Sequence, residues 1–251
     1  MFEGSVFKTK LYGDLIITKY INHKEVYVKF LDTGYETKAY FGNIKKSIVR
    51  DRSVPSILDV GVVGDEVTKV NGNRLKEYNL WQALLSRCYC DKFHVKCPTY
   101  KDCSVSDNFK YYPYFKEWCN NQIGFNVLDD KGSHFELDKD LLIKGNKVYS
   151  EDTCCFIPRE INVALIYNQT KKGNHPIGVS YSKVNNKFVV YVKKGEGSRE
   201  YLGYFEDASV AFLAYKASKE AYLKELANKW KDKIDLRVYE ALIGWEINID
   251  D

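Results

Sequence analysis

The chain has 251 residues, of which 45% are hydrophobic, 15% aromatic and 29% charged, and its formal net charge is +4. These values are ordinary for a globular protein with one large domain or two to three small ones, and this small surplus does not by itself indicate nucleic acid. No run approaches about 18 apolar residues, and the opening MFEGSVFKTK is typical of neither a signal peptide nor a transit peptide. We therefore expect a cytoplasmic protein with no membrane partner. Seven cysteines, an odd number, favour reduced thiols over a disulfide framework.

Residues 1–65 are expected to form a small β unit. Three β-rich runs, YGDLIITKY, KEVYVKFLDT and YETKAYFGNI, are separated by turn-forming pairs at 22–23 and 33–34. Such a unit is an SH3-like barrel or a curled meander, and either one can bind peptides, nucleic acid or another domain. A basic patch near its end, which we interpret as a solvated face, contains Lys45, Lys46, Arg50 and Arg52. The glycine-rich stretch 55–72 is expected to be a linker.

Residues 73–130 are expected to be mainly helical. The runs NRLKEYNLWQALLSRCYC and YPYFKEWCNNQI both place apolar residues at helical spacing. A group of possible zinc ligands falls within sixteen residues here: Cys88, Cys90, His94, Cys97 and Cys103. No two of these cysteines have the C-x₂-C or C-x₄-C spacing, with two or four residues between them, that structural zinc knuckles usually show. Zinc is therefore not expected, and we interpret these cysteines as core residues.

Residues 134–162 contain the pattern in which chemistry is expected. The strand HFELDKD, a Gly-Asn loop, a Tyr-Ser-Glu-Asp turn and a helix beginning near Pro158 outline a ββα order. Asp138 and Asp140 stand two positions apart on one strand face, so both are able to reach a hard cation such as Mg²⁺. The alternative is that both are surface or capping carboxylates.

This segment resembles the HNH nuclease motif in the degenerate form that accompanies AP2 domains. The resemblance is carried by the leucine-aspartate strand, the Gly/Asn loop, the Y-S-x-x-x-C turn and a helix with an asparagine. The run W-x-x-L-x-x-RCY ahead of it is similar to the segment that precedes this motif in phage and bacterial proteins that contain AP2 domains. The resemblance implies a metal-dependent DNA endonuclease. Its candidate catalytic residues are His134, Asp138, Asp140, Asn146 and Asn162, with Mg²⁺ or another divalent cation on Asp138 and Asp140.

One position departs from the pattern of an active HNH enzyme. Such an enzyme has His after the first Asp, where this chain has Lys139, and the nearest histidine is His134, four residues upstream of Asp138. A missing general base lowers the rate by about 10²–10⁴-fold. Whether hydrolysis is retained is therefore left open.

The stretch Gly178–Leu223 predicts a three-stranded sheet followed by one helix. Two runs around 179–181 and 188–192 alternate apolar and polar residues and are joined by an Asn-Asn turn, and a third run follows at 199–204. Asp207 stands where an N-cap belongs. The apolar face of the helix then comprises Ala208, Ala211, Phe212, Tyr215, Tyr222 and Leu226. Five basic residues against two acidic ones in 178–204 predict that the uncovered face of the sheet is positive.

This arrangement resembles the AP2 domain of plant transcription factors and phage homing endonucleases. The matching residues are GVSY, KFVVYV, YLGYF and the Ala-rich ASVAFLAYKA, about a fifth of the chain. The resemblance implies that the sheet lies in the major groove of double-stranded DNA. The DNA-binding residues expected from it are Tyr181, Lys183, Lys187, Val189, Tyr191, Lys193, Lys194 and Arg199, of which Lys183, Lys194 and Arg199 are expected on phosphates.

Together these patterns predict a multi-domain α+β protein. Its expected parts are an SH3-like unit (1–65), a helical and HNH-like domain (73–168), an AP2-like domain (177–228) and a C-terminal extension (229–251), with NQTKKGNHP as a linker before the AP2-like part. Three functions stay open. The chain is a phage DNA endonuclease of the homing type, an inactive relative that regulates or organises DNA, or a phage protein that binds a host protein, in each case in the host cytoplasm.

Overall fold

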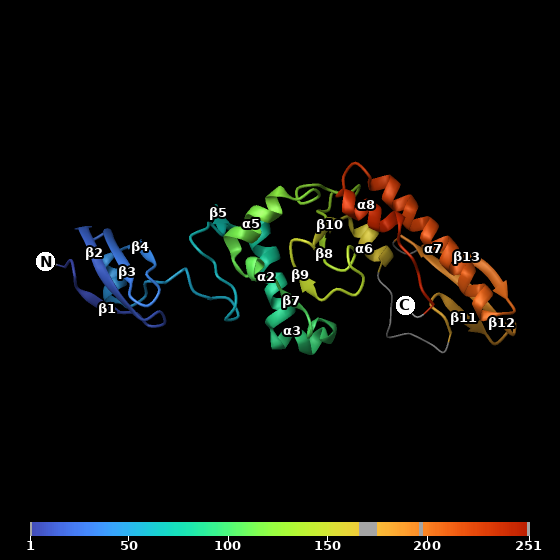
Figure 1. Ribbon diagram of the computed structural model, residues 1–251, viewed down its shortest axis with the longest axis horizontal. Coiled ribbons are helices and arrows are strands. Elements are labelled where there is room, and N and C mark those ends of the chain that lie inside the picture. The colour runs from blue at the N-terminus through green and yellow to red at the C-terminus, as the bar shows by residue number, and fades with distance from the viewer. Residues whose placement is uncertain (1, 166–174, 196–197, 250–251) are drawn as a thin grey trace. The chain divides into compact units, whose positions relative to one another are not determined.

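A computed structural model describes residues 2–165, 175–195 and 198–249 (Figure 1). The expected NQTKKGNHP linker lies outside these residues except for its last two positions. The described residues contain both helices and sheets, which confirms the α+β class. They divide into two compact units, Met1–Glu117 and Trp118–Asp251. Within the described part of the chain, no helix is both long enough and apolar enough to span a bilayer.

The first unit opens with a four-stranded antiparallel meander in the order β1-β2-β3-β4. Its strands are β1 (Val6–Lys8), β2 (Asp14–Asn22), β3 (Glu25–Phe30) and β4 (Glu36–Ala39), followed by the short helix α1 (Phe41–Lys45). The sequence of β3 explains the sheet: Val26, Val28 and Phe30 alternate with polar positions and are fully buried against Leu15 and Ile17 of β2. The first two predicted β runs are confirmed, and the third is a strand only in its first half, because its last residues form α1. Strand β1 was not predicted.

The second half of the first unit is mainly helical, as expected. Its elements are β5 (Lys69–Val70), β6 (Asn73–Arg74), α2 (Lys76–Tyr89), α3 (Asp91–Lys96), the 3₁₀ turn η1 (Pro98–Tyr100), β7 (Ser104–Val105), α4 (Asp107–Lys110) and the first part of α5 (Tyr112–Asn121), which ends in the second unit. Trp81 anchors it, because its ring is fully buried and its Nε1–H donates to the carbonyl of Phe109 at 2.7 Å. The β5–β6 hairpin begins inside the stretch expected to be a linker.

The second unit begins with the segment that was expected to have a ββα order. Its strands are β8 (Glu136–Asp138), β9 (Val148–Tyr149) and β10 (Cys155–Ile157), followed by α6 (Arg159–Leu165). β8 and β10 pair antiparallel, with Asp138 opposite Cys155. The first predicted strand is therefore shorter than expected. It ends at Asp138, because that carboxylate accepts hydrogen bonds from the backbone N–H groups of Asp140 and Leu141 and turns the chain.

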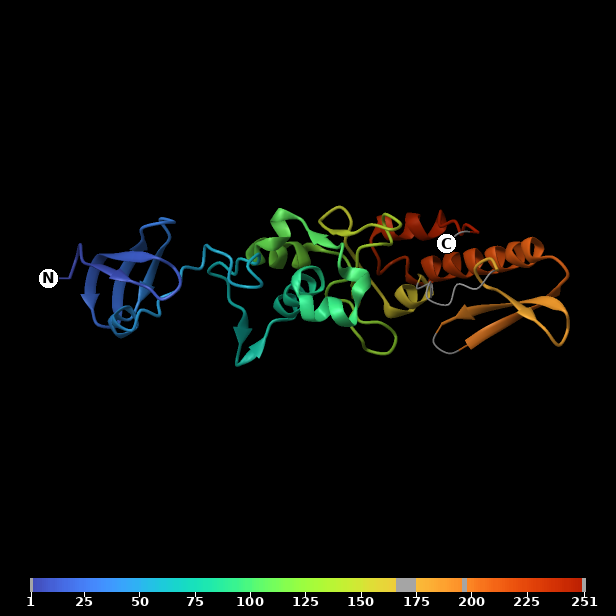
Figure 2. The ribbon, with the colours of Figure 1, turned by 90° about the horizontal axis from the view of Figure 1, so that it is seen from below.

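The remainder of the second unit is a three-stranded antiparallel sheet in the order β11-β12-β13. Its strands are β11 (Val179–Ser182), β12 (Lys187–Lys194) and β13 (Ser198–Phe205), and they are followed by α7 (Ala208–Trp230) and α8 (Leu236–Ile243). Helix α7 covers one face of the sheet (Figures 1 and 2). Asp207 caps α7 as predicted, since its carboxylate accepts from the N–H groups of Ser209 and Val210.

Residues from the C-terminal extension complete the core between this sheet and α7. Ile247 is buried there with Val190, Val192 and Ala211. At the start of β11, Gly178 has a φ of +76°, and a Cβ built on it would lie 2.1 Å from the Tyr215 ring of α7. The close approach of helix and sheet therefore requires glycine at this position.

Candidate nucleic-acid interface

The register of the sheet decides which side chains face away from α7. Val179 pairs with Val190, and both lie in the core beneath the helix. Side chains alternate along a strand, so Val189 and Tyr191 of β12 point to the opposite face. We call this the outer face of the sheet. The register assigns it Ser180, Ser182, Lys187, Val189, Tyr191, Lys193, Arg199, Tyr201 and Tyr204.

Three tyrosines form a row on the outer face. Tyr191, Tyr201 and Tyr204 are 45%, 50% and 44% exposed, and successive ring centroids lie 5.4 and 5.7 Å apart. The pKa of the Tyr201 phenol is raised, first because its hydration is partly lost and then because the phenols of Tyr204 and Tyr191 are close. The three side chains offer phenol hydroxyl groups as hydrogen-bond donors and exposed ring faces.

The predicted interface did not include Tyr201 and Tyr204, and Tyr204 lies on the outer face because a bulge changes the alternation. The pairing shifts between Val190 and Tyr191, so that Tyr191 faces Tyr201 while Val189 faces Tyr204. Two residues between the tyrosines accommodate the shift, and one of them, Gly203, has a φ of +127°. Strict alternation places Tyr201 and Tyr204 on opposite faces, whereas the bulge places both on the outer face.

Cations lie at both ends of this row. Lys193 of β12 stands directly opposite Arg199 of β13, and both side chains are exposed. Among the described residues, no carboxylate lies within ion-pairing distance of either one. At the other end, Lys187 forms an ion pair with Glu206 at 2.6 Å. The outer face thus combines exposed aromatic rings with two cations available to an anionic partner.

Four of the eight predicted DNA-binding residues do not contribute an exposed side chain to the outer face. Tyr181 pairs with Phe188 on the face toward α7, where their ring centroids lie 5.3 Å apart. Lys194 also lies on that side, 2.9 Å from the Glu200 carboxylate. Val189 is on the outer face but only 8% exposed. Lys183 lies in the exposed loop between β11 and β12.

The two candidate metal ligands do not share a strand face. Asp140 lies beyond the end of β8, so the expected alternation with Asp138 does not apply. Asp138 is half-buried, and one carboxylate oxygen accepts from the N–H groups of Asp140 and Leu141 at 2.8 and 2.7 Å. Burial raises the pKa of Asp138, while these two hydrogen bonds act in the opposite direction. This geometry is that of a capping carboxylate.

Lys139 occupies the centre of this loop. Its side chain is only 8% exposed, and its ammonium group forms an ion pair with Asp140, donates to the carbonyl of Asn146 at 2.9 Å and lies over the Tyr149 ring. Asn146 orders the loop as predicted, because its Nδ2 donates to the carbonyls of Lys139 and Val148. A lysine ammonium therefore already neutralises the carboxylate that was expected to hold a cation.

The remaining predicted catalytic residues, Asn162 and His134, lie outside the loop that contains Lys139 and Asn146. Asn162 of α6 donates through Nδ2 to Glu136 of β8 at 2.6 Å, and Arg159 binds the second oxygen of the same carboxylate at 2.9 Å. His134 is exposed and precedes β8. In the described residues, no three His, Cys, Asp or Glu side chains are grouped so that they could hold a metal ion. The arrangement does not fit the divalent cation that the resemblance implies.

Comparison with protein-family models, curated proteins and solved structures returned no match to this chain. Its function is therefore argued from its own residues.

Proposed function

We propose that this chain is a DNA-binding protein and that the outer face of the β11–β13 sheet is its duplex-binding surface. The observation that carries the proposal is the exposed row of Tyr191, Tyr201 and Tyr204 beside the uncompensated pair Lys193 and Arg199. The resemblance of this segment to AP2 domains supports the same surface.

The chemistry of the outer face suits a duplex. Lys and Arg side chains neutralise phosphates and release counterions, so they supply most of the sequence-independent affinity. Tyrosine hydroxyls donate to phosphate oxygens or to base acceptors, and the major groove of B-DNA, about 12 Å wide, admits a β-ribbon. Helix α7 supports the sheet from behind and leaves the outer face accessible (Figure 2).

A salt titration of duplex binding tests this proposal. Fluorescence anisotropy with a labelled duplex gives the slope of log K against log salt for the wild type and for Lys193→Gln/Arg199→Gln. Losing two phosphate contacts lowers the slope by about 1.8. The matched control, Lys224→Gln/Lys231→Gln, removes the same charge from exposed positions on and after α7 and leaves most of the slope intact. Equal losses in both variants would refute a role for the outer face.

The endonuclease prediction is a second candidate, and the observed position of Lys139 counts against it. Incubation of supercoiled plasmid with the protein and Mg²⁺ or Mn²⁺ is expected to give no nicked product. Asp138→Ala is the control for a contaminating nuclease. Nicking by the wild type that disappears in Asp138→Ala would restore the enzyme hypothesis.

A further inference from the structure

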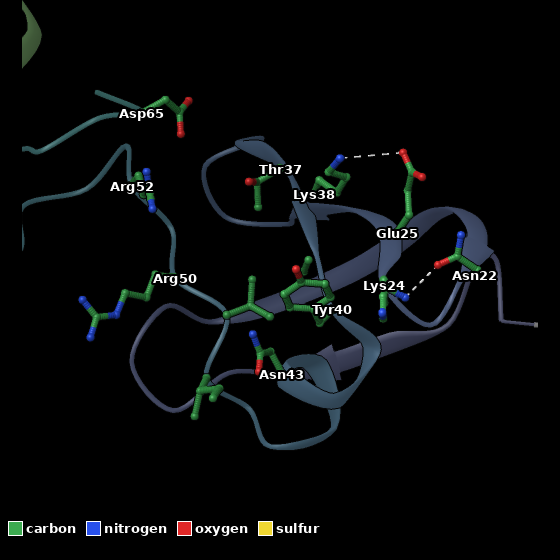
Figure 3. Close-up of a pocket in the computed structure, with 13 residues that line it drawn as sticks. Asn22, Lys24, Glu25, Thr37, Lys38, Tyr40, Asn43, Arg50, Arg52 and Asp65 are labelled. Atoms are coloured by element: carbon green, nitrogen blue, oxygen red, sulfur yellow. Dashed lines mark hydrogen bonds and ion pairs between the residues drawn. The ribbon is translucent and has the colours of Figure 1, made fainter. Parts of the chain in front are cut away.

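A groove in the first unit lies within the N-terminal β segment and the residues that follow it. Its volume is about 730 Å³. It runs past β2, β3 and β4, α1 and the segment from Ile48 to Arg52, and the side chains used below are Lys24, Lys38, Tyr40, Asn43, Arg50 and Arg52 (Figure 3). All of these residues belong to the first unit. The outer face of the sheet, in the second unit, takes no part in this groove.

The groove has an excess of positive charge. Lys24, Lys38, Arg50 and Arg52 stand against two carboxylates, Glu25 and Asp65. Both carboxylates have partners of their own, because Glu25 lies 3.8 Å from the Lys38 ammonium and accepts from Tyr27, and Asp65 accepts from Tyr35.

The other three cations remain available. Lys24, Arg50 and Arg52 are exposed, and in the described part of the chain no carboxylate lies within ion-pairing distance of any of them. The groove therefore offers two guanidinium groups and one ammonium group to an anion. Guanidinium groups bind phosphate oxygens through paired N–H donors.

An aromatic ring lies between these cations. Tyr40 follows directly after β4 and is 58% exposed. Figure 3 shows its ring near the middle of the labelled side chains, with Arg50 and Arg52 on one side and Lys24 on the other. Asn43 of α1 adds an amide to the same groove. Tyr40 is not among the partly buried side chains that pack against the core of this β segment.

Basic side chains that alternate with an exposed aromatic ring are the pattern of single-strand recognition. The cations follow the phosphates while a base stacks on the ring, an arrangement that tolerates any base because every base has a π-face. A duplex keeps its base faces stacked inside, so it gives Tyr40 nothing to stack on. An acidic peptide satisfies the cations but not the ring.

We propose that this groove binds single-stranded nucleic acid, with phosphates on Lys24, Arg50 and Arg52 and a base stacked on Tyr40. The site is separate from the outer face of the sheet and does not depend on it. If the outer face binds duplex DNA, the full chain has two nucleic-acid sites with different strand preferences.

The experiment uses the full chain with Lys193→Gln/Arg199→Gln, so that the outer face is disabled. Anisotropy with a labelled oligothymidylate of about 12 nucleotides gives Kd and the salt slope. Adding Arg50→Gln/Arg52→Gln is expected to lower the slope by about 1.4, the single-strand value for two phosphates. Tyr40→Ala is expected to weaken binding by about 5- to 140-fold, which corresponds to the loss of one stacked base.

The matched control adds Lys8→Gln/Lys10→Gln, two exposed cations of the same unit outside the groove. The control is expected to retain the slope, and hydrogen exchange is expected to show protection of 37–43 and 48–52 in the presence of the oligonucleotide. An equal loss in the control, tighter binding of the matching duplex in this background, or no effect of Tyr40→Ala would overturn the proposal.

The two proposals fail separately in these measurements. Failure of the outer face appears as duplex binding that Lys193→Gln/Arg199→Gln leaves unchanged. Failure of the groove appears as oligothymidylate binding that Arg50→Gln/Arg52→Gln leaves unchanged. Far-ultraviolet circular dichroism of each variant shows that it is folded, so that a loss of binding reports on the surface itself.

Discussion

Substitution of Asp138 distinguishes a capping carboxylate from a metal ligand. The carboxylate oxygen that accepts from the N–H groups of Asp140 and Leu141 is kept in Asp138→Asn and lost in Asp138→Ala. In the alanine variant the amide of the buried residue Leu141 loses its acceptor, which costs about 1–3 kcal/mol. Loss of the acceptor for the more exposed Asp140 amide costs less, because water replaces the oxygen. We expect Asp138→Ala to lower the free energy of unfolding by about 1.5–3 kcal/mol.

Asp138→Asn is expected to be neutral or stabilising at neutral pH. Burial raises the pKa of Asp138 in the folded state above its ordinary value of 3.8, so the folded protein binds its proton more tightly than the unfolded chain does. The wild type therefore loses stability as pH rises from about 4 through the folded-state pKa, and the asparagine variant does not. The advantage of Asp138→Asn should grow over that interval and then remain constant.

Chemical denaturation of wild type, Asp138→Asn and Asp138→Ala between pH 4 and 8, with and without Mg²⁺ or Mn²⁺, measures these differences. A capping role predicts that none of the three is stabilised by the metal. A metal ligand predicts the reverse, because a bound cation stabilises the folded wild type by mass action and the asparagine removes that gain. Metal-dependent stabilisation of the wild type alone would therefore refute the capping interpretation.

Two further substitutions test the packing of the second unit. Gly178→Ala is expected to cost about 2–5 kcal/mol, because a positive φ and a clash with the Tyr215 ring add together, whereas Gly145→Ala, at the same φ of +76° with no atom within 4 Å of the added Cβ, should cost only about 1–2 kcal/mol. Equal costs in thermal denaturation would show that the clash is relieved. Burial lowers the pKa of Lys219 to about 8, so its charge is unfavourable in the folded state below that pH. Lys219→Met should therefore raise the free energy of unfolding by about 1–2 kcal/mol at pH 7, and this gain should shrink between pH 8 and about 10.5 as the wild type recovers. The same gain at pH 7 and pH 10 would contradict this account.

Local patterns in the sequence were sufficient for most of the elements. The β-rich run KEVYVKFLDT predicted β3, and Asp207 was predicted as the N-cap that precedes α7, because both signals depend on neighbours in the chain. The candidate site was harder to predict. Tyr204 shares the outer face with Tyr201 only through a bulge that depends on pairing with β12.

The same limit applied to the predicted metal site. The expected alternation of Asp138 and Asp140 assumed a strand that continues, whereas side-chain hydrogen bonds to the backbone end it. The burial of Lys139 also depends on contacts with Asn146 and Tyr149 across the loop. The periodicity of the sequence does not indicate that the strand ends at Asp138 or that Lys139 is buried. Both features depend on the folded loop.

Helix α7 connects the two parts of the second unit at a fixed separation. Its first turns lie under the sheet, and in its last turn Lys229 and Trp230 both bind the Glu160 carboxylate of α6. Its 23 residues span about 35 Å. Lys194 of β12 lies over the Tyr222 ring, so about two turns of α7 separate the edge of the sheet from the Glu160 contact. An insertion of a few residues into α7 would change that spacing and also rotate the sheet.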